Sequence, residues 1–298
     1  MKSKWLILFI VFGLILTACG GGSDDAAEVE EVVAEEPAET LDAPATTAAA
    51  AEPEADPASI CLVLDIGGLG DLSFNDLAYS GYEKAIADFG MEGTFLEPDG
   101  GGENRGELLE LCAEAGNDLI IGNGFLFDAS MNEVAPNYPD LNFAITDGVA
   151  EPANVRGMLF DHAEGSFLAG VAAALKSTNN HVGFLGGVDF PLIHEFEQGF
   201  IAGVQAINPD IVIEIGYASV APDFSGFNDV VKGKEIALAQ YEAGADVIYH
   251  AAGGTGTGMF EAAKEVSEST GTKVWGIGVD FDQYYQVGNA LPELQEYI

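Results

Sequence analysis

The chain has 298 residues, of which 49 are acidic and 10 are basic, so its formal net charge at pH 7 is −39. From residue 59 onward the balance is 37 acidic against 8 basic residues, a formal net charge of −29. A surface this negative repels phosphate backbones, and we therefore expect no nucleic-acid partner.

The first 19 residues have the pattern of a lipoprotein signal peptide. Lys2 and Lys4 precede an apolar run at 5–16, which leads through Leu, Thr and Ala to Cys19. The run is about half of the roughly 20 residues that span a bilayer, so it favours an export signal over a transmembrane helix. We expect Cys19 to carry acyl chains that anchor the protein to the cell membrane, facing the periplasm or the cell exterior. The alternative is an ordinary secretion signal with a chance cysteine.

Residues 20–58 consist largely of Ala, Glu, Pro and Thr and contain no Lys or Arg. Such a segment has too little apolar surface to offset the loss of chain entropy on folding, and its like charges repel one another. We expect a disordered acidic tether. The 240 residues from 59 onward are enough for two lobes of ordinary domain size.

Short apolar runs rich in Val, Ile, Leu and Phe alternate with amphipathic stretches from residue 59 onward. The expected strands are 60–66, 93–97, 118–123, 141–146, 181–186, 211–217, 246–250 and 274–279. The expected helices are 73–89, 104–115, 128–135, 164–177, 192–207, 229–243 and 258–269. This alternation predicts an α/β fold with parallel sheets covered on both faces by helices.

The segment 154–162, NVRGMLFDH, breaks the alternation after four strands. We place the change of lobes there, with an N-terminal lobe at 59–155 and a C-terminal lobe at 156–285. Two doubly wound lobes joined by a hinge enclose a cleft, and ligands of open α/β sheets bind at the carboxyl ends of the strands. The loops after the strands therefore form the candidate site.

Carboxylates and aromatic rings dominate these loops. Asp71, Asp147 and Asp280 have the chemistry to accept hydrogen bonds from neighbouring hydroxyls, as a sugar ring requires. Three aromatic residues have rings suited to stacking on a flat ligand: Tyr79, Phe125 and Phe227. Simpler roles are open for several residues, since Asp71 or Ser73 suits a helix cap, Asp147 a turn, and Phe74 and Phe196 the core.

Cys61 and Cys112 are the cysteines that remain beside Cys19. We expect two buried free thiols, although export would permit a disulfide. No CxxC pair or clustered His and Cys spacing indicates a metal, and we expect no cofactor.

Five segments carry a resemblance to a known family. They are DIGGLGDLSFNDLAYSGYEKA at 65–85, GFLFDASMNEVAPNYPDLNFAITDG at 124–148, FDHAEGSFLAGVAAAL at 160–175, GFNDVVKGKEIA at 226–237, and HAAGGTGTGMFEAAKE with WGIGVDFDQYY at 250–265 and 275–285. Together the segments resemble the basic membrane protein family, the PnrA-like lipoproteins that bind purine nucleosides for ABC importers. The resemblance implies a type I periplasmic-binding-protein fold that closes on its ligand by a hinge, with permease and ATPase subunits as partners. We expect a monomer.

The resemblance also implies roles for individual residues. Asp71, Ser73 and Asn75 would contact the ligand from the first loop. Tyr79 and Phe227 would stack on the base, Gly254 would let the backbone approach, and Asp280 would bind ribose hydroxyls; Phe125 and Asp147 are further candidates. Gly70 stands where family members often have a second acid. Residues 286–298 would begin a return segment that the family continues through a helix bearing a ligand-facing lysine.

Two kinds of enzyme and a different binding protein are the alternatives. The glycine run at 253–258 resembles the phosphate loop of tubulin-like GTPases, but no GK[ST] or full GxGxxG follows it. An exported nucleoside or glycoside hydrolase would use paired carboxylates, yet neither GxSxG nor HExxH occurs. A binding protein for a sugar or another small metabolite fits the same fold class.

Overall fold

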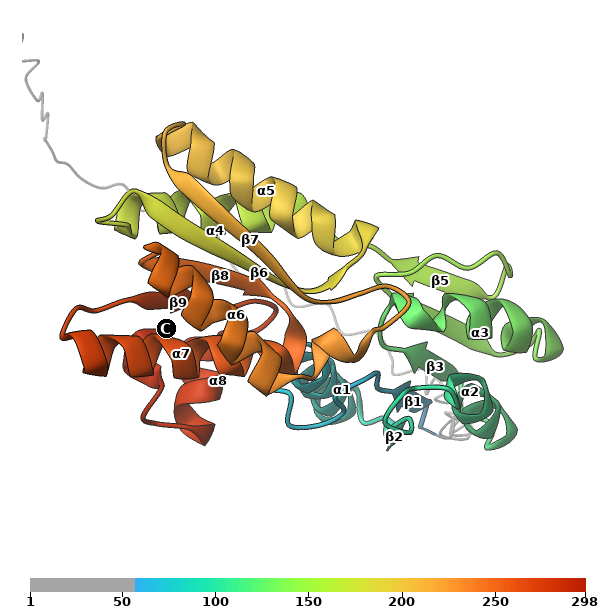
Figure 1. Cartoon of the computed structure of the whole chain (residues 1–298). Helices are drawn as coiled ribbons and strands as arrows, with labels where there is room; N and C mark the ends of the chain where they lie inside the picture. Colours follow the sequence, from blue (N-terminus) through green and yellow to red (C-terminus); the bar gives the residue numbers. More distant parts are fainter. Residues whose placement is uncertain (1–56) are drawn as a thin grey trace, which may run out of the picture. The chain divides into compact units, whose positions relative to one another are not determined.

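Two parallel β-sheets organise residues 57–298, the part of the chain that the computed structural model describes (Figure 1). The expected signal peptide, the expected acylation site Cys19 and the expected tether up to residue 56 lie outside these described residues. No helix within 57–298 combines the length and the apolar character that crossing a bilayer requires.

The first sheet has the strand order β2-β1-β3-β4-β5, and every neighbouring pair is parallel. Its strands are β1 (Ser59–Val63), β2 (Glu92–Leu96), β3 (Leu119–Gly122), β4 (Asn142–Thr146) and β5 (Val155–Met158). The helices between them are α1 (Phe74–Phe89), α2 (Arg105–Glu114) and α3 (Asp128–Val134). Alternate residues of β1 point to opposite faces, so Ile60 and Leu62 pack under α1 while Cys61 and Val63 pack under α2 and α3.

Strand β5 lies in the segment expected to cross between lobes. It pairs with β4, so the first sheet extends to Met158, past the lobe boundary expected at 155. The chain then enters the second lobe through helix α4 (His162–Lys176).

The second sheet has the order β7-β6-β8-β9 and is also entirely parallel. Its strands are β6 (His181–Asp189), β7 (Val212–Val220), β8 (Val247–Ala251) and β9 (Trp275–Ile277). Beside α4, its helices are α5 (Pro191–Ile207), α6 (Val230–Ala243), α7 (Gly256–Thr270) and α8 (Gln283–Ala290). One core cluster joins the sheet to α4 and α5 and another joins it to α6, α7 and α8, so both faces are covered (Figure 1). The α/β class and the two parallel sheets expected from the sequence are confirmed.

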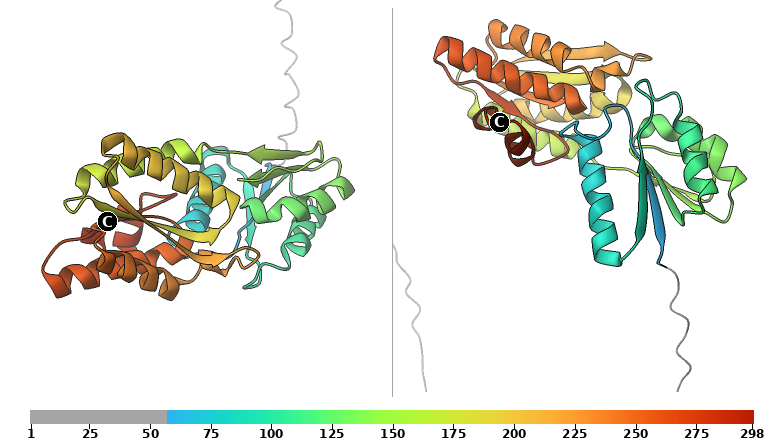
Figure 2. Two further views of the ribbon diagram at one scale, coloured as in Figure 1. Left: turned by 45° about the horizontal axis from the view of Figure 1, so that its top comes forward. Right: turned by 90° about the horizontal axis from the view of Figure 1, so that it is seen from below.

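Residues at and after 286 pack on the second lobe. Helix α8 spans the expected domain boundary, and Val287, Leu294 and Tyr297 are buried in the cluster that contains α6 and α7. Figure 2 shows the dark red C-terminal segment beside the start of the cyan helix α1.

The expectation of free thiols at Cys61 and Cys112 is wrong. The two residues form a disulfide with a Cα–Cα distance of 5.8 Å, within the range that such a bridge requires. Cys61 lies on β1 and Cys112 in the last turn of α2, directly above that face of the sheet. A spacing of 51 residues gave no sign of this proximity, which the folding of α2 onto β1 creates.

Candidate functional site

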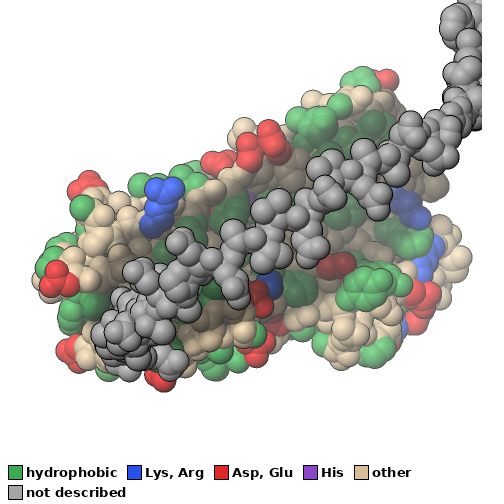
Figure 3. Space-filling model, turned by 180° about the vertical axis from the view of Figure 1, so that it is seen from behind, with side chains coloured by type: hydrophobic (Ala, Val, Ile, Leu, Met, Phe, Trp, Pro, Cys, Tyr) green, Lys and Arg blue, Asp and Glu red, His purple; other side chains and the backbone are tan. Residues whose placement is uncertain are grey.

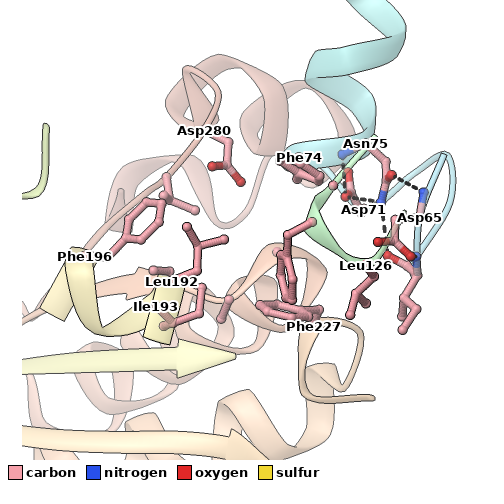
Figure 4. Close-up of a pocket in the computed structure, with 17 residues that line it drawn as sticks. Asp65, Asp71, Phe74, Asn75, Leu126, Leu192, Ile193, Phe196, Phe227 and Asp280 are labelled. Carbon is pink, nitrogen blue, oxygen red and sulfur yellow. Dashed lines mark hydrogen bonds between the residues drawn. The ribbon is translucent and has the colours of Figure 1, made fainter. Parts of the chain in front are cut away.

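A cavity, partly open to solvent, lies where the carboxyl ends of strands from both lobes meet. The first lobe contributes residues after β1 and β3 and from the start of α1. The second lobe contributes the start of α5, the 3₁₀ turn Ser225–Phe227, and the residues after β8 and β9. Its lining includes Asp65, Asp71, Phe74, Asn75, Phe125, Leu192, Ile193, Phe196, Phe227, Gly253 and Asp280 (Figure 4).

The loop between β1 and α1 is held by hydrogen bonds that its own side chains make with its backbone and with the first turn of α1. Asp71 Oδ1 accepts hydrogen bonds from the amides of Ser73 (2.9 Å) and Asp76 (3.1 Å), and Oδ2 accepts from the amide (2.8 Å) and Nδ2 (3.0 Å) of Asn75. Asn75 also accepts from the amide of Asp65 (2.9 Å) and donates to the carbonyl of Ile66 (3.1 Å). The carboxylate of Asp71 therefore caps the first turn of α1, the simpler role that the sequence left open. Burial raises the pKa of Asp71, although these amide donors act to lower it.

Ser73 reaches the second lobe. Its hydroxyl donates a 2.8 Å hydrogen bond to Oδ2 of Asp280, which follows β9. Within residues 57–298, Oδ1 of Asp280 accepts no hydrogen bond, so one carboxylate oxygen of this cavity-lining residue is available to a ligand. Desolvation of the carboxyl group at this site is the main cause that raises the pKa of Asp280 to about 6, and the neighbouring Asp71 and Asp147 add to the shift.

Tyr79 does not line the cavity. Its ring packs beside Tyr82 and Phe95, with centroid distances of 5.5 and 4.9 Å, on the face of the first sheet. Phe74 lines the cavity instead. An α-helix turns about 100° per residue, so a side chain five positions after Phe74 points well away from it. The Tyr79 side chain therefore does not lie where the family resemblance placed a ring that stacks on the base. Phe74, which the sequence assigned to the core, lines the cavity.

Four phenylalanines meet across the lobes at the cavity. Phe125 of the first lobe stacks on Phe190 of the second, with centroids 4.8 Å apart and planes inclined by 16°. It also makes edge contacts with Phe224 (5.9 Å) and Phe227 (6.4 Å). Phe74 and Phe227 enter the cavity from different lobes, and Asp280 projects between Phe74 and Phe196 (Figure 4).

Asp147 lies behind the lining. Its Oδ1 is 3.1 Å from Nε2 of His162, whose ring stacks on the cavity residue Phe196 at a centroid distance of 4.5 Å. The contact is close enough for an ion pair but its angles do not make a hydrogen bond, and Oδ1 has no other partner within 57–298. Burial disfavours the imidazolium of His162, yet the contact with Asp147 and the nearby Asp280 raise the pKa of His162 overall. Asp147 thus approaches the cavity only through His162.

Asp65 is a cavity carboxylate that the sequence reading missed. Its Oδ1 accepts from Nε of Arg105 at 2.9 Å and also pairs with Nη2 of that residue. Burial raises the pKa of Asp65, while Arg105 acts to lower it. The available signal was an acidic side chain near the carboxyl end of the expected apolar strand 60–66, because such positions reach the ligand edge of a parallel sheet.

Gly254 lies between two loops and not on the lining. A Cβ atom there would come 3.2 Å from Oδ1 of Asn228 and 3.5 Å from Cβ of Asp71. Gly253 lines the cavity and has a φ of 55°, a conformation that favours glycine. Residues 57–298 contain no group of three or more His, Cys, Asp or Glu side chains placed to hold a metal ion.

Residues 59–291 match the family model described as ABC transporter substrate-binding protein PnrA-like. The chain belongs to this family. Its cavity lies between two parallel-sheet lobes, as expected of a substrate-binding protein of an ABC transporter.

Relatives from several bacteria support this assignment. The chain is 35% identical over 286 residues to the CD4+ T-cell-stimulating antigen of Listeria innocua, an alignment that covers 94% of this chain and 72% of the relative. It is 36% identical over 234 residues to the ABC transporter nucleoside-binding protein BmpA of Lactococcus lactis, with coverage of 75% and 64%. Among solved structures, an ABC transporter solute-binding protein from Aeropyrum pernix K1 superposes with a TM-score of 0.68 at 29% identity, covering 80% of this chain and 71% of that one.

Proposed function

We propose that this PnrA-like protein captures a purine nucleoside in the cavity between its lobes and delivers it to an ABC importer. The observation that carries the proposal is the combination of rings and a carboxylate in one cavity. Phe74 and Phe227 supply aromatic faces from opposite lobes, and Asp280 offers a free carboxylate oxygen to ribose hydroxyls. A relative named as nucleoside-binding, 36% identical to this chain, supports the same ligand class.

The transport role follows from the family and from the two-lobed site. A ligand that contacts both lobes stabilises the closed form over the open one, and a permease recognises the closed form. We propose that acyl chains on Cys19 hold the protein at the outer face of the membrane, that separate permease and ATPase subunits complete the importer, and that the binding protein acts as a monomer.

Calorimetry of the full chain in detergent micelles tests the ligand assignment. The panel contains inosine, adenosine, guanosine, cytidine and uridine, with ribose as the control. We expect heat from the purine nucleosides and recovery of unchanged inosine by chromatography after incubation. Heat from ribose but not from the nucleosides would favour the sugar-binding alternative, and conversion of inosine to hypoxanthine would favour a hydrolase.

A set of three variants tests the stacking residues. Phe74→Ala and Phe227→Ala should each weaken purine nucleoside binding by about tenfold to a hundredfold, because loss of one aromatic stack costs about 1–3 kcal/mol. Tyr79→Ala is the matched control, since it removes a ring of α1 that packs on the first sheet. It should lower thermal stability and leave the affinity of the folded protein unchanged. The reverse pattern, with affinity lost only in Tyr79→Ala, would contradict the proposed site.

A further inference from the structure

Leu72 belongs to the first lobe in sequence but packs into the second. It precedes α1, and its side chain contacts the core cluster formed around α6, α7 and α8. Its φ of 54° lies in the left-handed region, which a residue with a branched side chain adopts only when its surroundings hold it there. The amide of Leu72 donates to Oδ2 of Asp76 at 3.2 Å, which holds the nitrogen side of this strained residue.

Gln283, the first residue of α8, holds the carbonyl side. Its Nε2 donates a 2.8 Å hydrogen bond to the carbonyl oxygen of Leu72, from one lobe to the other. Its Oε1 accepts from the amide of Val279 (2.9 Å) and contacts Nε2 of His250 (2.8 Å). Because burial lowers the pKa of His250 to about 4, its ring is neutral at pH 7, and Nε2 carries the proton that it donates to Gln283. With 2% exposure, the Gln283 amide is fixed in orientation.

Two further hydrogen bonds join the same two segments. Ser73, next to Leu72, donates to Asp280, and Nε2 of Gln286 donates to Oδ2 of Asp76 at 3.1 Å. The loop that leads into α1 is thus attached to the segment 280–286 of the second lobe. The free energy of this attachment favours the arrangement in which Phe74 and Asp280 line one cavity.

We propose that Leu72 and Gln283 are positioning residues that latch the two lobes in the ligand-binding arrangement without touching the ligand. Leu72 supplies the apolar contact and the carbonyl acceptor, and Gln283 supplies an amide whose orientation His250 and Val279 fix. The apparent affinity of a two-state binding protein scales with the fraction of molecules in the competent state. Loss of the latch therefore weakens binding even though every ligand-contacting group remains. The affinity part of this proposal rests on the proposed function.

Hydrogen exchange of the full chain in detergent micelles, without ligand, tests the latch directly. In Gln283→Glu the carboxylate keeps its acceptor role toward Val279 and His250 but faces the carbonyl of Leu72 with no donor. We expect amides in 66–76 to exchange at least about tenfold faster, since a lost buried hydrogen bond weakens the closed state by about that factor. Leu72→Ala removes the apolar contact from the first lobe and should speed exchange in 66–76 in the same way. It changes no residue of the second lobe, so it tests the latch even if Gln283→Glu does not fold.

Gln240→Glu is the matched control. Gln240 is also buried and donates to a backbone carbonyl, that of Phe184 at 2.9 Å, but both residues lie in the second lobe. This variant should speed exchange around β6 and α6 and leave 66–76 unchanged. Exchange in 66–76 at the parent rate in folded Gln283→Glu or Leu72→Ala would overturn the proposal.

Inosine titration adds the functional readout. We expect the Kd to rise about tenfold in Gln283→Glu and Leu72→Ala and to stay at the parent value in folded Gln240→Glu. Failure of the parent chain to bind any nucleoside would contradict the proposed function alone, because the exchange experiment needs no ligand and decides the latch separately.

Discussion

At the scale of single residues, two carboxylates with similar positions in the sequence have different hydrogen-bonding roles in the folded site. Asp71 and Asp280 both follow buried strands, and both were predicted to bind hydroxyls. In the folded protein the four donors of α1 and its loop occupy both oxygens of Asp71, whereas Asp280 accepts one hydrogen bond from Ser73 and keeps an oxygen free. Asp71 therefore shapes the site, and Asp280 is the carboxylate that we expect to meet the ligand.

The raised pKa of Asp280 predicts an effect of Asp280→Asn on stability. The charged form is disfavoured in the folded protein, so stability from this residue is present below about pH 4 and is lost as the pH rises through about 6. Asparagine imitates the protonated form. Urea unfolding without ligand should show Asp280→Asn to be more stable than the parent at pH 7 by about 1 kcal/mol or less, because Asp280 is exposed and solvent screens its charge. The difference should vanish near pH 4. A variant less stable than the parent at pH 7 would contradict the assigned desolvation cost, and purine nucleoside binding should weaken in either case.

At the scale of elements, helix α1 shows how a correct secondary structure still left a residue misassigned. The sequence placed this helix at 73–89 and the structure has Phe74–Phe89. Phe74 and Tyr79 lie on this helix, but only the packing of α1 on the first sheet decides which side faces the cavity. Periodicity alone does not distinguish the two sides, because both are buried against something.

Helices α4 and α5 pack closely because glycine, which has no side chain, lies at their contact. A Cβ on Gly203 of α5 would come 2.0 Å from the carbonyl oxygen of Phe167 on α4, whereas a Cβ on Gly165 of α4 would meet no atom within 4 Å. We expect Gly203→Ala to lower the free energy of unfolding by about 1–3 kcal/mol through overpacking. The control Gly165→Ala should raise it by about 0.5–1 kcal/mol, because alanine favours the helix. Denaturant unfolding measures both, and equal effects of the two substitutions would contradict the close helix contact.

At the scale of the whole molecule, charge is the dominant feature from residue 59 onward. Acidic side chains are scattered over the face in Figure 3 with few basic ones among them, in keeping with 37 acidic against 8 basic residues. Mutual repulsion of these charges destabilises the folded state, and salt screens it.

We therefore expect the melting temperature to rise as NaCl increases from about 0.05 M to 0.5 M, a change that shortens the Debye length to well below about 10 Å. Thermal unfolding followed by circular dichroism at constant pH measures the effect. Sodium sulfate at matched ionic strength serves to separate screening from ion-specific effects. A melting temperature that stays flat or falls over this range would show that ion pairs such as Lys234 with Glu265 outweigh the general repulsion.

The sequence by itself determined the order and type of nearly every element, because the central strands β1, β6 and β8 are apolar runs buried on both faces of a parallel sheet, and turns and amphipathic helices separate the strands. It also predicted that loops after the strands gather at one edge, since the carboxyl ends of parallel strands share it, and residues after β1, β3, β8 and β9 line the cavity whereas Asp147 after β4 does not. The tertiary structure alone decided the disulfide between Cys61 and Cys112, the exchange of Tyr79 for Phe74 at the cavity, and the contact of Leu72 with Gln283. Each of these depends on how a helix or loop packs on a sheet or on the other lobe. Local sequence patterns do not encode that packing, because it joins residues far apart in the chain or decides which side of a helix faces the cavity.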